Sequence, residues 1–376
     1  MIKTYKNSII IAVCTIILVA TGVVMVYSAS KYSADVNYGN KFFYMTKQLI
    51  GALIGLGAMV GTSIINHKIY KKFYIVAYVI GAVLLALVFV PGLSKSSYGA
   101  TRWISLGGFT IQPSEIAKFC LVLFLSVALT KGKDVNKPSK LLTVLFAGVV
   151  YCVLIMLEPN MSITICVGLT LVVMLFIGGL DIKKFLIGAI PIILLGVGLV
   201  VLEPYRLRRI VAFINPWENP LEEGYQLIQS LYAISSGGLF GVGLGRSRQA
   251  QLFLPFAESD FIFSIICEEL GWIGGVGILL IYLTLIITII KVGIKAKDNY
   301  SKFLCIGIAC VLGIQTVLNI CVVSGLIPPT GLPLPFISAG STSIVVFMSA
   351  MGIVINVDKQ TQNLREIKNK KDKIKV

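Results

Sequence analysis

Residues 258–290 read ESDFIFSIICEELGWIGGVGILLIYLTLIITII, where a polar loop runs directly into a long apolar stretch. A helix needs roughly 20 apolar residues to cross about 30 Å of hydrocarbon, so we expect residues 261–290 to span a membrane. Asp260 stands at the boundary of this span. A carboxylate there costs free energy and often marks a functional site, although aspartate is also a favoured helix N-cap. The residue alone leaves both interpretations open.

Similar apolar stretches recur along the rest of the chain. Of its 376 residues, 56% are hydrophobic, and the mean hydropathy is +0.89. This is more apolar side chain than a water-soluble fold of this length needs for its core. The expected spans are 8–29, 47–66, 72–91, 113–130, 141–157, 161–180, 184–203, 261–290, 303–326 and 338–357. We therefore predict an all-α polytopic membrane protein with about ten transmembrane helices.

Lys and Arg residues predict the orientation of these spans, because cytoplasmic loops are enriched in both. Most of the 33 basic residues fall on one side if the N-terminus is inside, including those of the KGKDVNKPSK loop at 131–140. Both termini are then cytoplasmic. Residues 1–357 form a single transmembrane domain, and residues 358–376 form a basic cytoplasmic tail. This bias accounts for the net charge of +16, so the charge does not indicate a nucleic-acid partner.

Cysteine and histidine usage argues against several kinds of site. All eight cysteines fall inside expected spans, where they are typical of small buried hydrophobic residues rather than of disulfides or metal ligands. His67 is the only histidine, which argues against a histidine-based metal site or a Ser-His-Asp triad. Any chemistry would have to use carboxylates, Lys, Arg or the backbone.

A large extracytoplasmic loop, at about 204–260, separates the seventh and eighth expected spans. Within it, Gln226, Gln229 and Ala233 recur at helical spacing, which predicts an amphipathic helix over 223–236 at the outer membrane surface. The run GGLFGVGLGRSRQ at 237–249 follows, and its glycines permit close backbone approach. It is either a loop whose amides and Arg246 face a phosphate, or a tight packing turn.

Further charges lie in or near the span at 113–130. In TRWISLGGFTIQPSEIAKF (101–119), Arg102 and Trp103 precede this span, while Glu115 and Lys118 lie three residues apart within it. Glu115 and Lys118 can form a structural ion pair on one helix face. Alternatively, Lys118 and Arg102 are cations that bind an anionic substrate. Polar groups inside a span are expensive, so either role is worth testing.

Three other carboxylates lie at or inside expected spans. Glu158 begins the EPN turn, where we expect it to be exposed at the outer surface. Glu268 and Glu269 lie about 100° apart on a helix, so at least one needs a partner within the bundle, and we expect structural roles. Asp260 and Glu268 would lie ~12 Å apart along one helix, beyond the roughly 5 to 9.5 Å of a glycosidase carboxylate pair. If Asp260 is catalytic, it acts as a lone base.

Taken together, these motifs resemble the SEDS family, whose members include FtsW, RodA and SpoVE. The matching segments are GATRWISLGGFTIQPSEIAKF at 99–119, EP at 158–159, GYQLIQSLYAISSGGLFGVGLGRS at 224–247, ESDFIFSIICEELG at 258–271 and GLPLPFIS at 331–338. The resemblance covers nearly the whole chain. It implies a peptidoglycan glycosyltransferase of the bacterial cytoplasmic membrane that polymerises lipid II, a disaccharide peptide linked to undecaprenyl pyrophosphate, at the outer face. It also implies a class B penicillin-binding protein transpeptidase as partner, and a membrane-lipid environment.

The resemblance implies that Asp260 is the essential residue, acting as general base on the sugar hydroxyl that attacks the donor. Cations such as Arg102, Lys118 and Arg246, or a divalent Mg²⁺ or Mn²⁺, would stabilise the departing pyrophosphate; no organic cofactor is implied. The residues expected to bind substrate are Arg102, Trp103, Glu115, Lys118, Glu158, Gln226, Gln229 and Arg246.

Three segments depart from the family pattern. Asn160 replaces the aspartate of E-P-D, Phe256 replaces a glutamate four residues before Asp260, and FISAGSTS at 336–343 carries Ala339 and Ser341 in place of an aromatic residue and a glycine. Two alternatives therefore remain. The chain could be a lipid II flippase, although it lacks the evident inverted repeat of many transporters. It could also be a weakly active scaffold of a division or sporulation complex.

Overall fold

The structure is a computed structural model that describes residues 5–97, 100–106, 109–130, 135–186, 204–222 and 224–374. It is built mainly of helices. These are α1 Lys6–Tyr38, α2 Phe43–Ile64, α3 Lys68–Lys72, α4 Tyr74–Leu87, α5 Pro113–Thr130, α6 Pro138–Leu157, α7 Met161–Ile177, α9 Pro204–Ile214, α10 Tyr225–Ser236, the π-helix η1 Gln249–Phe253, α11 Ile262–Lys295, α12 Asn299–Val323 and α13 Ser341–Ile374.

The long helices confirm the all-α polytopic fold. Within the described ranges, α1, α2, α5, α6, α11, α12 and the first 24 residues of α13 are long and apolar enough to cross a membrane, and α4 and α7 are shorter apolar helices. Nine of the ten expected spans coincide with these helices. Most of the remaining one, 184–203, lies outside the described residues, so the total of ten stays a prediction.

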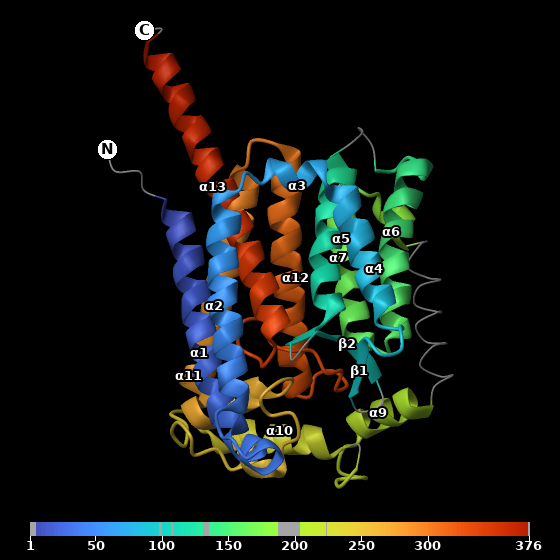
Figure 1. Ribbon diagram of the computed structural model, residues 1–376, viewed down its shortest axis with the longest axis vertical. Helices are drawn as coiled ribbons and strands as arrows, with labels where there is room; N and C mark the ends of the chain where they lie inside the picture. Colours follow the sequence, from blue (N-terminus) through green and yellow to red (C-terminus); the bar gives the residue numbers. More distant parts are fainter. Residues whose placement is uncertain are drawn as a thin grey trace.

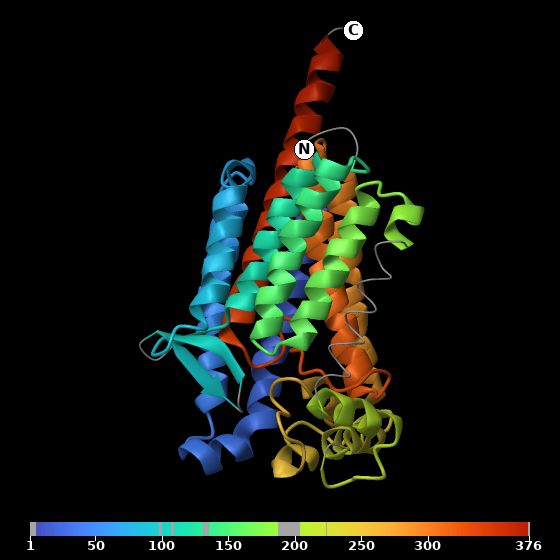
Figure 2. The ribbon, with the colours of Figure 1, turned by 90° about the vertical axis from the view of Figure 1, so that its right-hand side faces the viewer.

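The helices run side by side as one bundle with two distinct ends. α1 begins and α13 finishes at the same end, and α13 continues past residue 357 without a break. At the opposite end, α9 and α10 lie across the bundle (Figure 1), and the view turned by 90° places the strands at this end as well (Figure 2). We call it the loop end. The shared end of α1 and α13 is what an even number of crossings requires.

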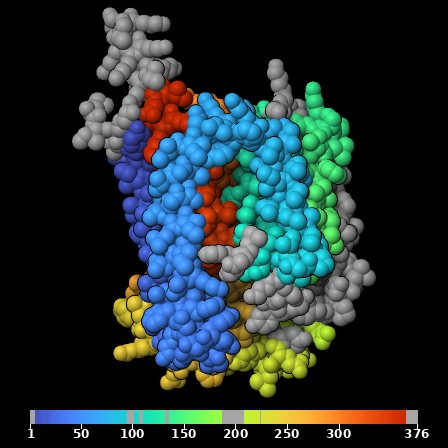
Figure 3. All heavy atoms as spheres, in the orientation of Figure 1, coloured from blue at the N-terminus to red at the C-terminus, as the bar shows by residue number. Residues whose placement is uncertain are grey.

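A close helix contact explains Gly352 of the bundle. α13 packs along α2, while α12 packs against α5, α7 and α11. A Cβ atom at Gly352 of α13 would overlap the carbonyl group of Met59 in α2, so only glycine allows this approach. The surface is hollowed between α2 and α4, and α13 is visible between them (Figure 3).

A small sheet lies at the loop end, between the expected spans at 72–91 and 113–130, where the sequence predicts no strand. Strands β1 Ser94–Ser97, β2 Ala100–Leu106 and β3 Phe109–Ile111 form a three-stranded antiparallel sheet in the order β1-β2-β3. Ile104 faces Ile111 across β2 and β3, a pairing of β-branched residues that suits strands. The sheet matters because β2 carries Arg102 to the site described next.

Candidate active site

Asp260 lies at the loop end, two residues before α11. Phe261 is the N-cap of α11 and no side chain caps this helix, so the Asp260 carboxylate does not serve as a cap. Asp260 is half-buried, and its carboxylate accepts no hydrogen bond from the described residues. Burial raises its pKa from 3.8 to about 6; Arg102 and Arg209 oppose this rise, and Glu258 adds to it. The carboxylate is therefore placed for something other than capping.

Three backbone carbonyls hold the loop that carries Asp260. The amide of Ala339 donates to the carbonyl oxygen of Glu258 at 2.8 Å, and the Ser338 hydroxyl donates to that of Ser259 at 2.6 Å. The carbonyl oxygen of Asp260 itself accepts from Asn319 Nδ2 at 2.8 Å. The segments ESD (258–260) and GLPLPFIS (331–338), both of which resemble the SEDS family, are therefore held next to each other in the fold.

The non-helical segment 327–336, which we call the proline strap, borders the carboxylate. Gly331 in the strap has φ 70°, a left-handed conformation that favours glycine. A Cβ atom at Gly331 would lie 3.0 Å from Asp260 Oδ2. The strap backbone therefore approaches the carboxylate closely, and a side chain at position 331 would crowd it.

Two arginines from distant segments act on Asp260. Arg102 of β2 donates through Nε to the Glu158 carbonyl oxygen at 3.3 Å and through Nη2 to the Pro159 carbonyl oxygen. Arg209 of α9 donates through Nη1 to the Pro329 carbonyl oxygen at 3.0 Å. Sequence reasoning missed Arg209. Its only signal was the charged and apolar mixture of PYRLRRIVAFI at 204–214, which does not distinguish one arginine from another.

Glu158 is buried rather than exposed, which corrects the expectation for the EPN turn. Its side chain is 0% exposed, and neither carboxyl oxygen has a hydrogen-bond partner in the described part of the chain. Burial raises its pKa to about 8, against the opposing effect of Arg102. The turn is drawn inward because its carbonyls bind Arg102 and Asn160 caps α7. Arg102 thus acts on both Glu158 and Asp260.

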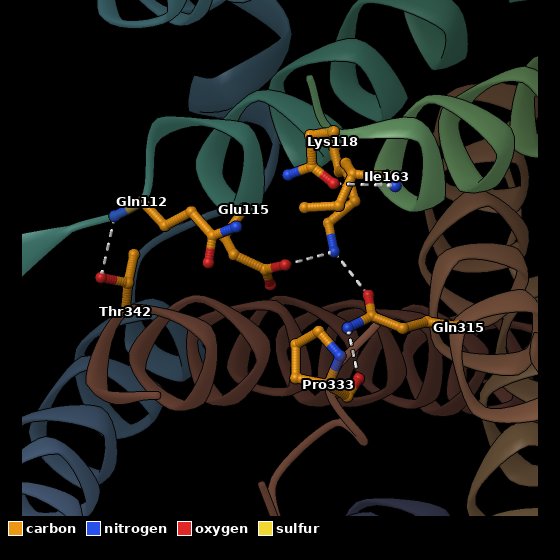
Figure 4. A network of polar contacts seen from close by, with 8 residues as sticks. Gln112, Glu115, Lys118, Ile163, Gln315, Pro333 and Thr342 are labelled. Carbon is orange, nitrogen blue, oxygen red and sulfur yellow. Dashed lines mark hydrogen bonds and ion pairs between the residues drawn. The ribbon is translucent and has the colours of Figure 1, made fainter. Parts of the chain in front are cut away.

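Glu115 and Lys118 form a buried ion pair that reaches the proline strap. Lys118 Nζ lies 2.9 Å from Glu115 Oε1, and the two side chains are 1% and 0% exposed. Lys118 also donates to Gln315 Oε1, and Gln315 Nε2 donates to the Pro333 carbonyl oxygen at 2.9 Å (Figure 4). Lys118 is not among the charges that act on Asp260. Its contacts therefore agree with a structural ion pair with Glu115, the first of the two roles considered for Lys118.

The remaining predicted residues lie on β2, on α10 and in the glycine-rich run 237–249. Trp103 follows Arg102 on β2 and is half-buried, Gln226 and Gln229 are half-buried on α10, and Arg246 is exposed. Arg246 is not among the charges acting on Asp260. The structure therefore brings Arg102 towards Asp260, places Glu158 beside Arg102, and leaves Arg246 outside this group.

The glycine-rich run 237–249 packs against α11. The amides of Val242 and Gly243 donate to the carbonyl oxygens of Glu268 and Glu269, as a packing turn requires. The Glu268 carboxylate accepts from Ser247 and from the amide of Arg248, and the Glu269 carboxylate accepts from the Ser28 hydroxyl. These bonds agree with structural roles for both glutamates.

The side chains around Asp260 do not build a metal cage. Over the ranges that the structure describes, no three His, Cys, Asp or Glu side chains converge, and the charged groups acting on Asp260 are two guanidinium groups and one carboxyl. Mg²⁺ and Mn²⁺ prefer several oxygen ligands. This donor set does not fit them, and we derive no step through a metal.

Comparison with known proteins gives consistent relatives over nearly the full length. A cell cycle protein family, FtsW/RodA/SpoVE, matches residues 8–363. Stage V sporulation protein E of Bacillus subtilis (strain 168) is 39% identical, with 96% of this chain and 99% of that protein covered. The probable peptidoglycan glycosyltransferase FtsW of Geobacter sp. (strain M18) is 37% identical, with coverages of 93% and 95%.

Solved structures agree in fold. A chain from work on structural coordination of polymerization and crosslinking by a peptidoglycan synthase complex has a TM-score of 0.78 and 26% identity, covering 93% of this chain and 97% of that one. The rod shape determining protein RodA of Thermus thermophilus has a TM-score of 0.69 at 24% identity, covering 93% and 96%, and shows the fold alone. The family expected from the motifs is confirmed: the chain belongs to the FtsW/RodA/SpoVE family of cell cycle proteins.

Proposed function

We propose that the protein is a peptidoglycan glycosyltransferase that polymerises lipid II into glycan strands at the outer face of the cytoplasmic membrane. The observation that carries the proposal is the surroundings of Asp260. A half-buried carboxylate, free of hydrogen bonds from the described residues, lies beside Arg102 and Arg209 and against the backbone of Gly331. Relatives named as probable peptidoglycan glycosyltransferases support this reading.

Asp260 is the proposed general base. A pKa of about 6 leaves it mainly ionised at pH 7 yet more basic than an ordinary aspartate, which suits proton transfer near neutral pH. The acceptor sugar's 4-hydroxyl oxygen forms a bond to the anomeric carbon of the donor, and its proton passes to Asp260. The bond from that carbon to pyrophosphate oxygen breaks with inversion, and the lipid pyrophosphate leaves with the electron pair.

Arg102 and Arg209 are the proposed partners of the departing pyrophosphate. Guanidinium groups bind phosphate oxygens strongly and in fixed geometry. Arg102 is half-buried, so its charge is less screened by water than that of exposed Arg246. We therefore assign the pyrophosphate to Arg102 and Arg209, and we place Trp103, Gln226 and Gln229 around the sugars and peptide of the substrate. Buried Glu158 contributes through Arg102, which it faces.

The membrane orientation follows from the basic loops. With both termini cytoplasmic, the loop end and Asp260 face the outer surface, where lipid II would be consumed. The hollow between α2 and α4 (Figure 3) offers a route for the polyprenyl tail. A class B penicillin-binding protein is the proposed partner, since a solved structure of this fold belongs to a peptidoglycan synthase complex.

A reconstitution with lipid II tests this function. Purified protein and its cognate transpeptidase would receive lipid II, and glycan polymer would be resolved by gel, while a parallel proteoliposome assay would follow transfer of labelled lipid II between leaflets. We expect polymer and no protein-dependent transfer. Transfer without polymer would favour a flippase, and the absence of both would favour a scaffold; either result would contradict the proposal.

A further inference from the structure

Five main-chain carbonyl oxygens of the proline strap accept hydrogen bonds from side chains, and each of the five donors is a different residue outside the strap. Arg209 of α9 donates to Pro329 and Ser162 of α7 donates to Thr330. Asn319 and Gln315 of α12 donate to Leu332 and Pro333, and Tyr282 of α11 donates to Pro335. The strap is non-helical backbone inside a helical bundle, so its carbonyls need these donors.

Asn319 differs from the other four donors because it also holds the loop of Asp260. Its Nδ2 atom lies 2.7 Å from the Leu332 carbonyl oxygen and 2.8 Å from the Asp260 carbonyl oxygen. Leu332 follows Gly331, the residue whose backbone lies against the Asp260 carboxylate. One amide group therefore fixes the main chain on both sides of this contact.

The hydrogen bonds of Asn319 show which part of the side chain matters. The residue is 1% exposed. Both Nδ2 hydrogens have acceptors, whereas Oδ1 accepts nothing from the described residues. Burying an amide acceptor without a partner costs free energy, and a leucine of similar size would avoid this cost. The two donors of its amide nitrogen therefore explain an asparagine at this position.

We propose that Asn319 is a positioning residue, which sets the distance between the Asp260 carboxylate and the strap without touching substrate. This inference rests on the proposed role of Asp260 as base. Reacting groups must be held closely, and a misplacement of about 1 Å can reduce the rate about a hundred-fold. Removing the two donors should therefore lower kcat and leave KM nearly unchanged.

The test compares Asn319→Leu with Thr316→Val in the full-length protein. Thr316 is buried on the same helix, and among the described residues its hydroxyl bonds only to the Leu312 carbonyl oxygen within α12, so Thr316→Val controls for loss of a buried polar group. Hydrogen–deuterium exchange of the peptide covering 327–336 is measured together with the kinetics of lipid II polymerisation. For Asn319→Leu we expect faster exchange in the strap and a fall in kcat of about ten- to a hundred-fold; for Thr316→Val both should match wild type.

Exchange is measured without substrate, so the two proposals fail separately. Unchanged exchange of the strap in Asn319→Leu would overturn the inference, whether or not the protein polymerises lipid II. Faster exchange with wild-type kcat would also overturn it, because the strap would then not position Asp260. Wild-type protein that makes no polymer would instead contradict the proposed function. If Asn319→Leu does not fold, Asn319→Ser, which keeps one donor in a smaller side chain, replaces it with the same criteria.

Discussion

At the scale of the residue, Asp260 is a half-buried carboxylate, and no structural role in its own loop explains its charge. Its carboxylate does not cap α11, and two arginines offset only part of the cost of burial. Functional groups are commonly held in such unfavourable surroundings, and their removal then increases stability while it abolishes activity. Asp260 should therefore behave differently from an ordinary surface aspartate.

We expect Asp260→Asn to be more stable than wild type at pH 7.5. The folded-state pKa is raised from 3.8 to about 6, so folding disfavours the ionised form, at a cost on the order of 1–3 kcal/mol. The wild type should regain this stability as the pH falls from about 6 towards 4, so the difference in stability between Asp260→Asn and wild type should become smaller. Thermal unfolding at several pH values measures it, with exposed Asp181→Asn as control. A less stable Asp260→Asn would show that the carboxylate stabilises the fold.

The arginines supply a second test at this scale. Arg209 lowers the pKa of Asp260, so Arg209→Gln should move the acid limb of the pH–rate profile of polymerisation to higher pH. Exposed Arg208 is the matched control on the same helix, and Arg208→Gln should leave the limb in place. Equal shifts in both variants would mean that only the general charge of α9 matters.

At the scale of the element, the ion pair of α5 links a span to the strap. Lys118 is buried with Glu115 and binds Gln315, which binds Pro333. Buried pairs add little net stability, but removing one partner leaves an uncompensated charge. Substitutions in the pair should therefore reduce the free energy of unfolding more strongly than they reduce the rate of catalysis.

Lys118→Met should destabilise the protein by about 3–5 kcal/mol, because Glu115 would be left charged and buried. The double variant Glu115→Gln with Lys118→Met should recover much of this loss. Denaturant unfolding in detergent gives both values. If the double variant is as unstable as the single one, packing of the lysine side chain, rather than charge, explains the effect.

Elements were predictable from sequence to different degrees. Apolar runs of about 20 residues predicted nine helices, because the bilayer sets their length. The short strands β1–β3 carry too little local signal to be predicted from the sequence. Glu158 was expected to be exposed because its burial depends on Arg102, 56 residues away along the chain. Arg209 and Asn319 became recognisable only once the fold placed them beside Asp260.

At the scale of the whole molecule, the two ends of the bundle carry different polar networks. Opposite the loop end, His67 is 2% exposed and joins two segments distant from it in sequence. Its Nδ1 lies 2.9 Å from Asn356 Oδ1 on α13, and its Nε2 lies 2.7 Å from Ser301 Oγ on α12. The single histidine of the chain thus connects the α2–α3 turn with both C-terminal helices.

The contribution of His67 to stability should therefore fall as the pH drops below about 6.5, and it is read as the difference between wild type and a His67 variant. Burial lowers the pKa of His67 below 6.5, with Lys68 acting in the same direction and Asn356 and Asp298 opposing it. The stability present above the unfolded-state pKa is lost as the pH falls towards the lower folded-state pKa. Thermal unfolding of wild type and His67→Gln between pH 7.5 and 5.5 measures this. A variant with the same loss on acidification as wild type would assign the effect to other groups.

The most direct measurement of the central claim is the rate of lipid II polymerisation by Asp260→Asn relative to wild type, at equal amounts of folded protein and with the cognate transpeptidase present. General bases contribute about 10²- to 10⁴-fold to rate, so the account predicts a loss of at least about a hundred-fold, with the variant folded and no less stable. Polymer formed by Asp260→Asn at the wild-type rate would contradict the assignment of Asp260 as the base.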